Sequence, residues 1–430
     1  MLKNLYNSVN KSNVTIGVIG LGYVGLPLSI LFAKKKFKVI GFDIDKKKIQ
    51  ILNKSKSYIK RISDQEINKI YHRGFCTNNF SFIKNCDFII ICVPTPLKKN
   101  KPNLEYITST FSNIKSYLRE GQVLILESTS YPGTTREILS KNLSKRFNLG
   151  ENFFLGFSSE RIDPGSNEKF IQKIPKVVSG YSKNCLKIVH HFYKKFFDQI
   201  VQAKSLEIAE FSKLVENIYR AVNIGFINEM KIVADKMNLD IYEILKVAKT
   251  KPFGFNVFEP GPGVGGHCIP IDPNYLHWKA KKYGIEPKFI KLSEKINTNV
   301  LKFILLKIKS VLKFKKSKKN NKKILILGLA YKKNVDDLRE SASLKLIDYL
   351  NKFRIRYEFS DPFIKTNIVT RDLIIKKKSI KITPINLKRF DLVVLMTDHD
   401  IFDYKMIYKF SNKIIDCRGR YQVDNKVIRA

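Results

Sequence analysis

Short runs of β-branched and apolar residues alternate with helical patterns along the first half of the chain. Residues 26–35 have helical spacing, and the runs that predict strands cover residues 14–20, 38–42, 88–93, 123–127, 153–157 and 176–179. Strands that alternate with helices are typical of a parallel sheet covered on both faces. The pattern therefore predicts an α/β domain over residues 13–204.

The middle of the chain, residues 205–312, has almost no strand pattern. Apolar residues recur there at helical spacing over roughly eight turns. They are Ile208, Phe211, Val215, Ile218, Val222, Phe226, Met230, Val233 and Met237. A helix this long and this apolar is expected to be a spine between domains or subunits. We therefore expect a central helical dimerisation domain, with a homodimer or a higher homo-oligomer as the assembly.

The last part of the chain repeats the α/β pattern on a smaller scale. Residues 313–323 are mostly Lys, Asn and Ser, which predicts an exposed linker. Strand patterns follow at residues 324–328 and 392–395, with a helical pattern at 343–350 between them. The sequence therefore predicts a second α/β domain over residues 320–430.

Composition supports a folded protein of two or three domains, because 430 residues exceed one ordinary core of about 100–200 residues. No run reaches the roughly 18 uncharged apolar residues that a membrane helix needs. The first residues have no apolar segment long enough for a secretory signal. Six cysteines without a CxxC pair argue against a disulfide framework or a zinc module. We expect a soluble, reduced, cytoplasmic protein with no metal site and no membrane insertion.

The net charge of +41 is the one unusual feature of the composition. Lys supplies 64 of the 79 basic residues, and these lysines are scattered through every segment. Readers of nucleic acid favour Arg and concentrate their charge on one face. We therefore interpret the lysines as solvated surface residues and expect no specific nucleic-acid partner, while an anionic partner or membrane surface remains an alternative.

The first chemical motif is the glycine pattern of residues 20–25, which follows a predicted strand and opens a predicted helix. Gly20 permits the tight turn, Gly22 lets a pyrophosphate approach the backbone, and Gly25 lets helix and strand pack closely. Asp43 ends the next strand and would accept hydrogen bonds from a ribose while repelling a 2′-phosphate. This pattern predicts a dinucleotide site that prefers NAD to NADP.

The second motif, residues 261–272, places four glycines within six positions ahead of Cys268. Such a segment forms a loop whose backbone can press against a ligand. A cysteine directly after that loop, with Asp272 four residues on, suggests an activated thiolate. A buried inert cysteine is the alternative. His267 could act as a base, but a sequence neighbour usually points elsewhere.

The third constellation lies on the predicted spine helix. Glu210, Lys213 and Asn217 are spaced by three and four residues, so they share one face, opposite the apolar stripe. Lys and Asn one turn apart could together donate hydrogen bonds to a developing oxyanion. A solvated helix face is the alternative interpretation.

Taken together, these motifs resemble the UDP-glucose/GDP-mannose dehydrogenase family, the nucleotide-sugar 6-dehydrogenases, from about Val14 to Arg420. The matching motifs occupy, in order, residues 20–25, 93–96, 127–129, 159–160, 213 with 217, 265–272, 328–332 with 339, and 416–418. The resemblance implies an α/β fold with an N-terminal NAD-binding Rossmann domain, a central helical dimerisation segment and a C-terminal Rossmann-like UDP-binding domain. In the last of these the turn reads Gly-Leu-Ala-Tyr, so the GxGxxG pattern is lost.

The family's reaction is a four-electron oxidation of a sugar C6 alcohol to a carboxylate with two NAD. The resemblance implies that Cys268 captures the intermediate aldehyde as a thiohemiacetal, and that a second hydride transfer gives a thioester that water hydrolyses. Lys213 and Asn217 would stabilise the oxygen at C6. Asp272 and Thr129 would hold and activate water, and Glu160 is a candidate for the hydrolysis step.

The remaining expectations from the resemblance concern binding. NAD contacts are expected at Gly20, Gly22, Tyr23, Val24, Gly25, Asp43, Val93, Pro94, Thr95, Thr129 and Arg339. UDP-sugar contacts are expected at Glu160, Arg161, Lys213, Asn217, Glu259, Gly261, Gly263, Tyr331, Lys332 and Arg418. Arg339 would meet the NAD pyrophosphate, and the loop of residues 259–263 would wrap the substrate.

Two places depart from the UDP-glucose pattern. Residues 251–256 stand where those enzymes carry an Arg, and residues 163–165 read Asp-Pro-Gly where they have Glu-Gly. Residues 250–273 look most like the UDP-N-acetylglucosamine 6-dehydrogenase branch, which makes UDP-N-acetylglucosaminuronate for surface polysaccharides such as O-antigen. UDP-N-acetylmannosamine, UDP-N-acetylgalactosamine and UDP-glucose remain alternative substrates, and a catalytically silent nucleotide-sugar or NAD sensor is a more remote one.

Overall fold

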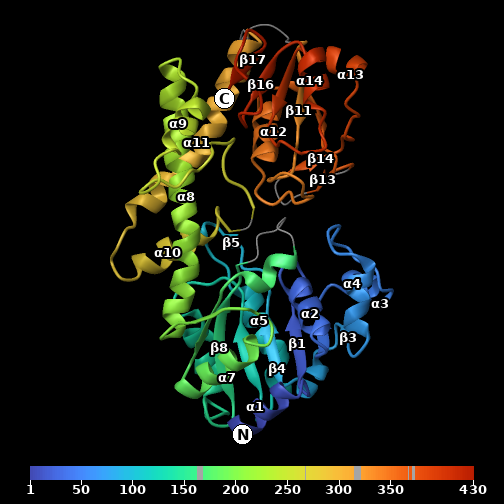
Figure 1. The fold of residues 1–430 in the computed structure, drawn as a ribbon, viewed down its shortest axis with the longest axis vertical. Coiled ribbons are helices and arrows are strands. Elements are labelled where there is room, and N and C mark those ends of the chain that lie inside the picture. Colours follow the sequence, from blue (N-terminus) through green and yellow to red (C-terminus); the bar gives the residue numbers. More distant parts are fainter. Residues whose placement is uncertain (162–167, 267, 314–320, 367, 370–372) are drawn as a thin grey trace. The chain divides into compact units, whose positions relative to one another are not determined.

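The computed structural model describes residues 1–161, 168–266, 268–313, 321–366, 368–369 and 373–430. They divide into two compact units (Figure 1). The first consists of Met1–Glu216 and Asn274–Ile285, and the second of Asn217–Pro273 and Glu286–Ala430. Residues 163–165, His267 and most of the expected linker at 313–323 lie outside the described residues.

The first unit is built on one sheet with helices between its strands. Its strands are β1 (Thr15–Ile19), β2 (Lys38–Phe42), β3 (Phe75–Thr77), β4 (Phe88–Ile91), β7 (Val123–Leu126), β8 (Phe154–Ser159), β9 (Lys176–Gly180) and β10 (Ile200–Gln202), with a small separate hairpin of β5 (Leu97–Lys98) and β6 (Lys101–Pro102). Its helices are α1 (Leu2–Asn10), α2 (Gly25–Lys34), α3 (Lys46–Asn53), α4 (Asp64–Tyr71), α5 (Glu105–Ile114), α6 (Lys141–Leu143) and α7 (Lys183–Tyr193), with the shorter helical segments η1 (Phe80–Asn85), η2 (Lys115–Tyr117), η3 (Thr135–Ser140) and η4 (Glu168–Lys173).

The eight strands of the large sheet follow the order β10-β9-β8-β7-β4-β1-β2-β3. Neighbouring strands are parallel except at one place, because β9 runs antiparallel to β8. The expectation of a wholly parallel sheet is therefore wrong at this edge. A parallel return normally needs a crossover helix, whereas the described part of the connection holds only the one short segment η4.

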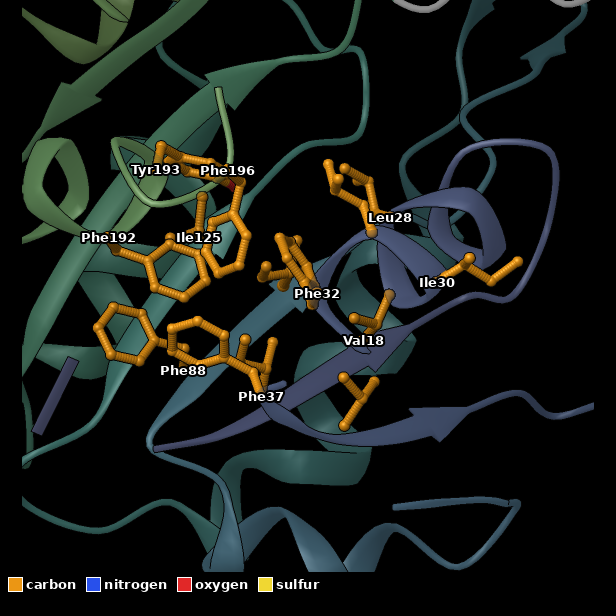
Figure 2. Packing of buried hydrophobic residues seen from close by; sticks show 14 of the residues in the cluster. Val18, Leu28, Ile30, Phe32, Phe37, Phe88, Ile125, Phe192, Tyr193 and Phe196 are labelled. Carbon is orange, nitrogen blue, oxygen red and sulfur yellow. The ribbon is translucent and has the colours of Figure 1, made fainter. Parts of the chain in front are cut away.

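The strands of this sheet are buried on both faces. In β4, Phe88 and Ile90 belong to one hydrophobic cluster, and Ile89 and Ile91 belong to the cluster on the other face. This division follows from the two-residue period of a strand. Figure 2 shows the first cluster, where the Phe88 ring stacks on Phe192 with ring centroids 4.2 Å apart.

The second unit carries a smaller parallel sheet. Its strands are β11 (Lys323–Leu327), β12 (Arg356–Ser360), β15 (Leu392–Leu395), β16 (Ile414–Asp416) and β17 (Val427–Arg429), in the order β12-β11-β15-β16-β17, with a separate hairpin of β13 (Ile368–Val369) and β14 (Ile374–Ile375). Its helices are α9 (Ile241–Ala248), α11 (Lys288–Val311), α12 (Ala342–Lys352), α13 (Pro384–Lys388) and α14 (Tyr404–Phe410). Two further helices, α8 (Leu206–Lys236) and α10 (Asp272–Lys281), contribute residues to both units.

The spine helix predicted from the sequence is α8, the longest helix of the described chain at 31 residues. Its apolar stripe is open to solvent in the single chain, with Phe226 and Met237 exposed to 52% and 63%. The polar residues Glu210 and Asn217 on the opposite face are buried, at 0% and 4%. The solvated-face interpretation of that constellation is therefore wrong for these two residues.

Among the described residues, no helix has both the length and the apolar character that crossing a membrane requires.

Candidate active site

The glycine turn between β1 and α2 has the geometry of a dinucleotide cradle. Gly20 has φ +93°, and a Cβ at position 25 would lie 2.0 Å from the Gly20 carbonyl oxygen. A Cβ at Gly22, by contrast, would meet no atom within 4 Å. Gly20 and Gly25 therefore close the turn, and Gly22 leaves open backbone at the start of α2, where a pyrophosphate fits.

Asp43 follows β2 and is tied to the same turn. Its Oδ2 accepts a hydrogen bond of 3.0 Å from the Leu21 backbone N–H, and its Oδ1 accepts one of 2.9 Å from Asp45. Lys48 lies 3.4 Å from Oδ2. The carboxylate is 6% exposed and fixed in place, as an acceptor for ribose hydroxyls needs to be. These features fit NAD, which supplies the hydride acceptor when bound.

The other expected cofactor contacts of the first unit lie at the carboxyl ends of neighbouring strands. Val93, Pro94 and Thr95 follow β4, and the backbone oxygen of Thr95 accepts a 3.0 Å hydrogen bond from the Tyr275 hydroxyl. Thr129 follows β7 and is partly buried. Ligands in doubly wound folds bind at this edge. Tyr23 and Val24 lie in the glycine turn itself, partly buried.

The glycines of the loop that carries Cys268 pack closely against the Tyr331 side chain. A Cβ at Gly265 would lie 2.7 Å from the Tyr331 Cβ, and one at Gly266 would lie 2.9 Å from its ring. The Gly266 N–H also donates to the backbone oxygen of Arg339 at 2.9 Å. The glycines are therefore needed because any side chain would displace the loop from this surface.

Cys268 lies in the turn that leads into α10. Its backbone oxygen accepts hydrogen bonds from the N–H groups of Ile271 (3.1 Å) and Asp272 (2.8 Å). Asn217 of α8 donates its Nδ2–H to Asp272 Oδ2 at 2.5 Å, and both side chains are buried. The turn thus ties the backbone of Asp272 to that of Cys268, and Asn217 of α8 holds the Asp272 carboxylate. This brings together three residues that the sequence singled out in two separate motifs.

In the first unit, Lys213 and Glu210 hold two loops at the strand ends. The Lys213 ammonium donates to the backbone oxygen of Glu160. The Glu210 carboxylate accepts from the N–H groups of Gly133 (2.5 Å) and Thr135 (2.8 Å) and from the Thr135 hydroxyl (2.7 Å). Burial raises the pKa of Glu210 to about 7 even so. These contacts fix the segment after Thr129 and the segment at Glu160 to one helix.

Two residues of the same helix face were missed by the sequence analysis. Asn228 accepts from the Gly261 N–H at 3.0 Å, and the buried Lys231 donates to the Gly261 oxygen at 3.0 Å. Both polar groups of the Gly261 peptide are therefore held by α8. The signal was present, because residues 217, 228 and 231 follow the same three- and four-residue spacing as residues 210 and 213.

The stability of the protein should depend on the titration of Lys231. Burial lowers the pKa of this ammonium to about 8, below the ordinary value of about 10.4. Between these values the unfolded chain binds the proton more tightly, so stability rises with pH over that window, by about 3 kcal/mol in total. Urea unfolding at pH 7.5 and pH 10.5 should show this gain in the wild type and lose it in Lys231→Met. An equal change with pH in both proteins would contradict the prediction.

Some of the expected UDP-binding residues of the second unit lie against the glycine loop of residues 261–266. A Cβ at Gly261 would lie 3.1 Å from an Arg418 guanidinium nitrogen, and the Arg418 Nε donates to the Met396 oxygen at 2.7 Å. Gly263 has φ +128°. Lys332 is partly buried. Arg418 and Tyr331 thus flank the loop on the described surface of this unit.

Two of the expected binding residues are exposed, and two form ion pairs. Glu259 is exposed. Arg339 is also exposed, and its guanidinium binds Asp337 at 2.6 Å. Arg161 of the first unit forms an ion pair with Glu216. The roles assigned to these three residues stay predictions.

The second α/β unit keeps the acidic residue of a dinucleotide fold but uses it internally. Asp361 follows β12 and accepts from the N–H groups of Leu329 and Ala330 at 2.6 and 3.1 Å, as Asp43 does from Leu21. Its Oδ2 also lies 3.2 Å from Nε2 of His399, whose Nδ1 accepts from Asn334. Burial opposes the ionised form, but the hydrogen bonds from His399, Leu329 and Ala330 together outweigh it and hold the pKa of Asp361 below its usual value. The carboxylate is thereby occupied where a ribose would need it.

An NAD cradle, a cysteine in a glycine loop and a second Rossmann-like unit without its own cradle define a class of protein: a dehydrogenase that binds a nucleotide-linked substrate. Comparison with known proteins makes this specific. The chain belongs to the UDP-glucose/GDP-mannose dehydrogenase family, whose NAD-binding domain matches residues 14–197, central domain residues 207–299 and UDP-binding domain residues 325–424. It is an NAD-dependent UDP-sugar dehydrogenase.

Relatives of the chain include enzymes for two different sugars. It is 34% identical to a UDP-N-acetyl-D-glucosamine 6-dehydrogenase of Pseudomonas aeruginosa, over 82% of this chain and 83% of that protein. It is 35% identical to a UDP-N-acetyl-D-mannosamine dehydrogenase of Campylobacter jejuni, over 79% and 83%. The solved structure of the Pyrococcus horikoshii UDP-D-ManNAc dehydrogenase has a TM-score of 0.86 at 28% identity, covering 96% of this chain and 98% of that one.

Proposed function

We propose that the protein oxidises the C6 alcohol of a UDP-linked 2-acetamido sugar, first of all UDP-N-acetylglucosamine, to the carboxylate through covalent intermediates on Cys268. The observation that carries the proposal is the buried Asn217–Asp272 hydrogen bond at the turn that holds Cys268. A structural cysteine would not need a fixed carboxylate and a fixed amide at its turn. A nucleophile that must be activated, acylated and released does.

Cys268 divides the oxidation into two hydride losses and one hydrolysis. The first hydride leaves C6 and the hydroxyl proton leaves the oxygen, which gives an aldehyde. The Cys268 sulfur adds to the aldehyde carbon, and the aldehyde oxygen takes up the proton that the thiol loses, which gives a thiohemiacetal. A second hydride and a second proton then leave, which gives the thioester. Each hydride removes two electrons, so the whole oxidation removes four, and the last step is hydrolysis without a redox change.

The polar face of α8 supplies the groups that stabilise these states. Lys213 and Asn217, one turn apart, would donate hydrogen bonds to the C6 oxygen as its charge develops. Thr129 and Asp272 would hold the water that attacks the thioester. Glu160, whose backbone oxygen accepts from Lys213, would take the proton of that water. Each of these roles is a proposal that follows from the family's positions.

The acetamido sugar is supported by the relatives, and the choice between two epimers is a matter for experiment. UDP-N-acetylglucosamine and UDP-N-acetylmannosamine enzymes match the chain equally well. Purified protein with NAD should form NADH with UDP-N-acetylglucosamine in preference to UDP-N-acetylmannosamine, UDP-N-acetylgalactosamine and UDP-glucose, each assayed in parallel. A higher kcat/KM for another of these sugars would contradict the proposed substrate and leave the chemistry standing. The product, a UDP-sugar uronate, suits surface polysaccharide synthesis.

The exposed stripe of α8 is proposed to pack against a second copy of the chain. Ile208, Phe211, Val215, Phe226 and Val233 lie along the stripe and are 43–52% exposed. A contiguous apolar face of this length is normally covered by a partner, and a second copy brings an identical face. Light scattering should give a dimer or larger assembly for the wild type.

The matched variants test which surface is used. Phe226→Lys should shift the protein to monomer, because a charge cannot be buried in an apolar interface without a partner. Tyr283→Lys changes an aromatic residue outside the stripe that is even more exposed than Phe226, and it should leave the assembly unchanged. A monomeric wild type would contradict the proposal.

A cytoplasmic location stays a proposal. It is supported by the six cysteines, all within the described part of the chain, none of which forms a disulfide. Such thiols are typical of a reducing compartment.

A further inference from the structure

Three charged side chains are buried together at the carboxyl edge of the first unit's sheet. The Lys176 ammonium lies 2.8 Å from Glu127 Oε2 and 3.2 Å from Glu160 Oε2. The side chains of Lys176 and Glu127 are 2% and 0% exposed, and that of Glu160 is 10% exposed. Lys176 thus bridges a fully buried carboxylate and one that reaches the surface.

The strand register explains why these residues meet. β8 pairs with β9 antiparallel, with Ser159 opposite Val177, so the next pair along is Glu160 and Lys176. β7 pairs with β8 in parallel, which brings Glu127, the residue after β7, to the same edge. The antiparallel return of β9 is therefore what delivers the ammonium. A parallel β9 would place Lys176 at the opposite edge of the sheet.

Polar groups from other described segments also face the cluster. The Tyr193 hydroxyl of α7 donates to Glu127 Oε1. The Arg161 N–H donates to Glu160 Oε1 at 2.6 Å, and Lys213 donates to the Glu160 backbone oxygen. Cys92 lies near enough for both carboxylates to raise the pKa of its thiol, which burial already raises.

The charges of the cluster do not balance when all three groups are ionised. Burial and the nearby Glu160 carboxylate raise the pKa of Glu127, Lys176 lowers it, and the net result is a pKa of about 7. Burial disfavours the Lys176 ammonium, but the two carboxylates outweigh that effect and raise its pKa. The Lys176 ammonium is thus shared by two carboxylates. Replacing Lys176 or Glu127 therefore changes the electrostatic environment of Glu160.

We propose that Lys176 and Glu127 are positioning residues that set the ionisation and orientation of Glu160 for hydrolysis of the Cys268 thioester. This inference rests on the proposed function. In the step concerned, a bond forms between the water oxygen and C6, and the bond between C6 and sulfur breaks. The water proton passes to Glu160, the sulfur leaves as thiolate, and no electrons are transferred.

If the ion pair had only a structural role, its variants would behave differently from what this proposal predicts. A buried pair that only supports the fold lowers stability when it is broken, and its loss has no directed effect on a pH profile. A pair that acts on Glu160 shifts the acidic limb of turnover, and the direction depends on which partner is removed. Removing the cation favours protonated Glu160, and removing the competing anion favours ionised Glu160.

The test compares Lys176→Met, Lys176→Arg and Glu127→Gln in the full-length protein. For each variant the NADH burst, the steady-state rate from pH 5.5 to 9 and the thioester trapped by hydroxylamine are measured. Lys176→Met should keep the burst, accumulate trappable thioester, lose roughly 10–100-fold in steady-state rate and shift its acidic limb to higher pH. Glu127→Gln keeps the shape and should shift the limb to lower pH. Lys176→Arg should restore most of the rate.

Controls separate the possible failures. Lys34→Met breaks a partly exposed ion pair with Glu66 in the same unit. It should leave the amount of trapped thioester and the pH dependence of the steady-state rate unchanged. Limbs that shift in the same direction, or not at all, would overturn the inference while the trapped wild-type thioester upheld the proposed function. No trappable thioester in the wild type would overturn the proposed route and this inference with it. If Lys176→Met does not fold, the direction of the Glu127→Gln shift decides.

Discussion

Replacing Cys268 by Ala is expected to lower the rate of carboxylate formation by about 10⁴-fold or more, the scale found when a catalytic nucleophile is removed. In the proposed route the Cys268 sulfur holds the aldehyde, so without it the second hydride loss has no bound intermediate to act on. The loss should appear in the rate of carboxylate formation, and not in the affinity for NAD, whose cradle lies between β1 and α2. Product analysis after prolonged incubation measures the effect.

The control for this variant is a cysteine of the core. Cys185 is fully buried in the cluster of the first unit and accepts a hydrogen bond from the Leu155 N–H at 3.4 Å. Cys185→Ala should lower the melting temperature and retain turnover per folded molecule. Carboxylate formation by Cys268→Ala within tenfold of the wild type would refute a covalent role for the thiol.

Replacing Lys213 by Met is expected to lower kcat by about 10²–10³-fold, the usual cost of losing one preorganised donor to a developing oxyanion. The ammonium is partly buried and fixed on the Glu160 backbone oxygen, so its direction is set before substrate binds. KM for the UDP-sugar should change much less, because the contact strengthens in the transition state. Rapid-quench measurement of the first NADH burst isolates the effect on hydride loss.

A lysine on the same helix gives the matched control. Lys236 is exposed at the end of α8, and Lys236→Met should leave kcat within a factor of about two, as expected for a surface change away from such a site. A Lys213→Met enzyme with unchanged kcat and raised KM would show that the residue only binds substrate. That outcome would contradict a role in stabilising the oxyanion.

Much of the fold follows from local patterns in the sequence. The strands predicted at residues 38–42 and 392–395 have those bounds in the structure, and eight of the nine residues of the apolar stripe lie on α8, with Met237 just after its end. These elements have strong periodicity and are buried. The short strands β3 and β10 were missed because three residues do not establish a period. β12 was missed because charged residues occupy alternate positions of its sequence, Arg356 and Glu358.

The sequence predicts those parts of the candidate site that form within one short segment. It does not predict the parts that form where segments far apart in the sequence meet. The Gly20–Gly25 turn and the Cys268–Asp272 turn are local, so spacing along the chain is enough to find them. The Asn228 and Lys231 contacts to Gly261 follow the helix period but need the position of the loop. Lys176 gave no signal, because its role depends on the direction of β9, which the local pattern does not encode.

The domain boundaries proposed from the sequence, 13–204, 205–312 and 320–430, stay predictions. The described residues form two compact units, and α8 and α10 each contribute residues to both. The helical middle segment therefore does not separate as a compact unit of its own in the single chain. It is the segment whose exposed stripe we propose to be covered by a second copy.

The stoichiometry of the wild-type reaction tests the central claim most directly. Purified protein is incubated with limiting UDP-N-acetylglucosamine and excess NAD until NADH formation ends, and the products are then separated. We predict two NADH for each UDP-sugar consumed and one UDP-sugar carboxylate, with no free aldehyde at any time. One NADH for each sugar, with the aldehyde as the product, would contradict the claim that Cys268 holds the intermediate for a second oxidation.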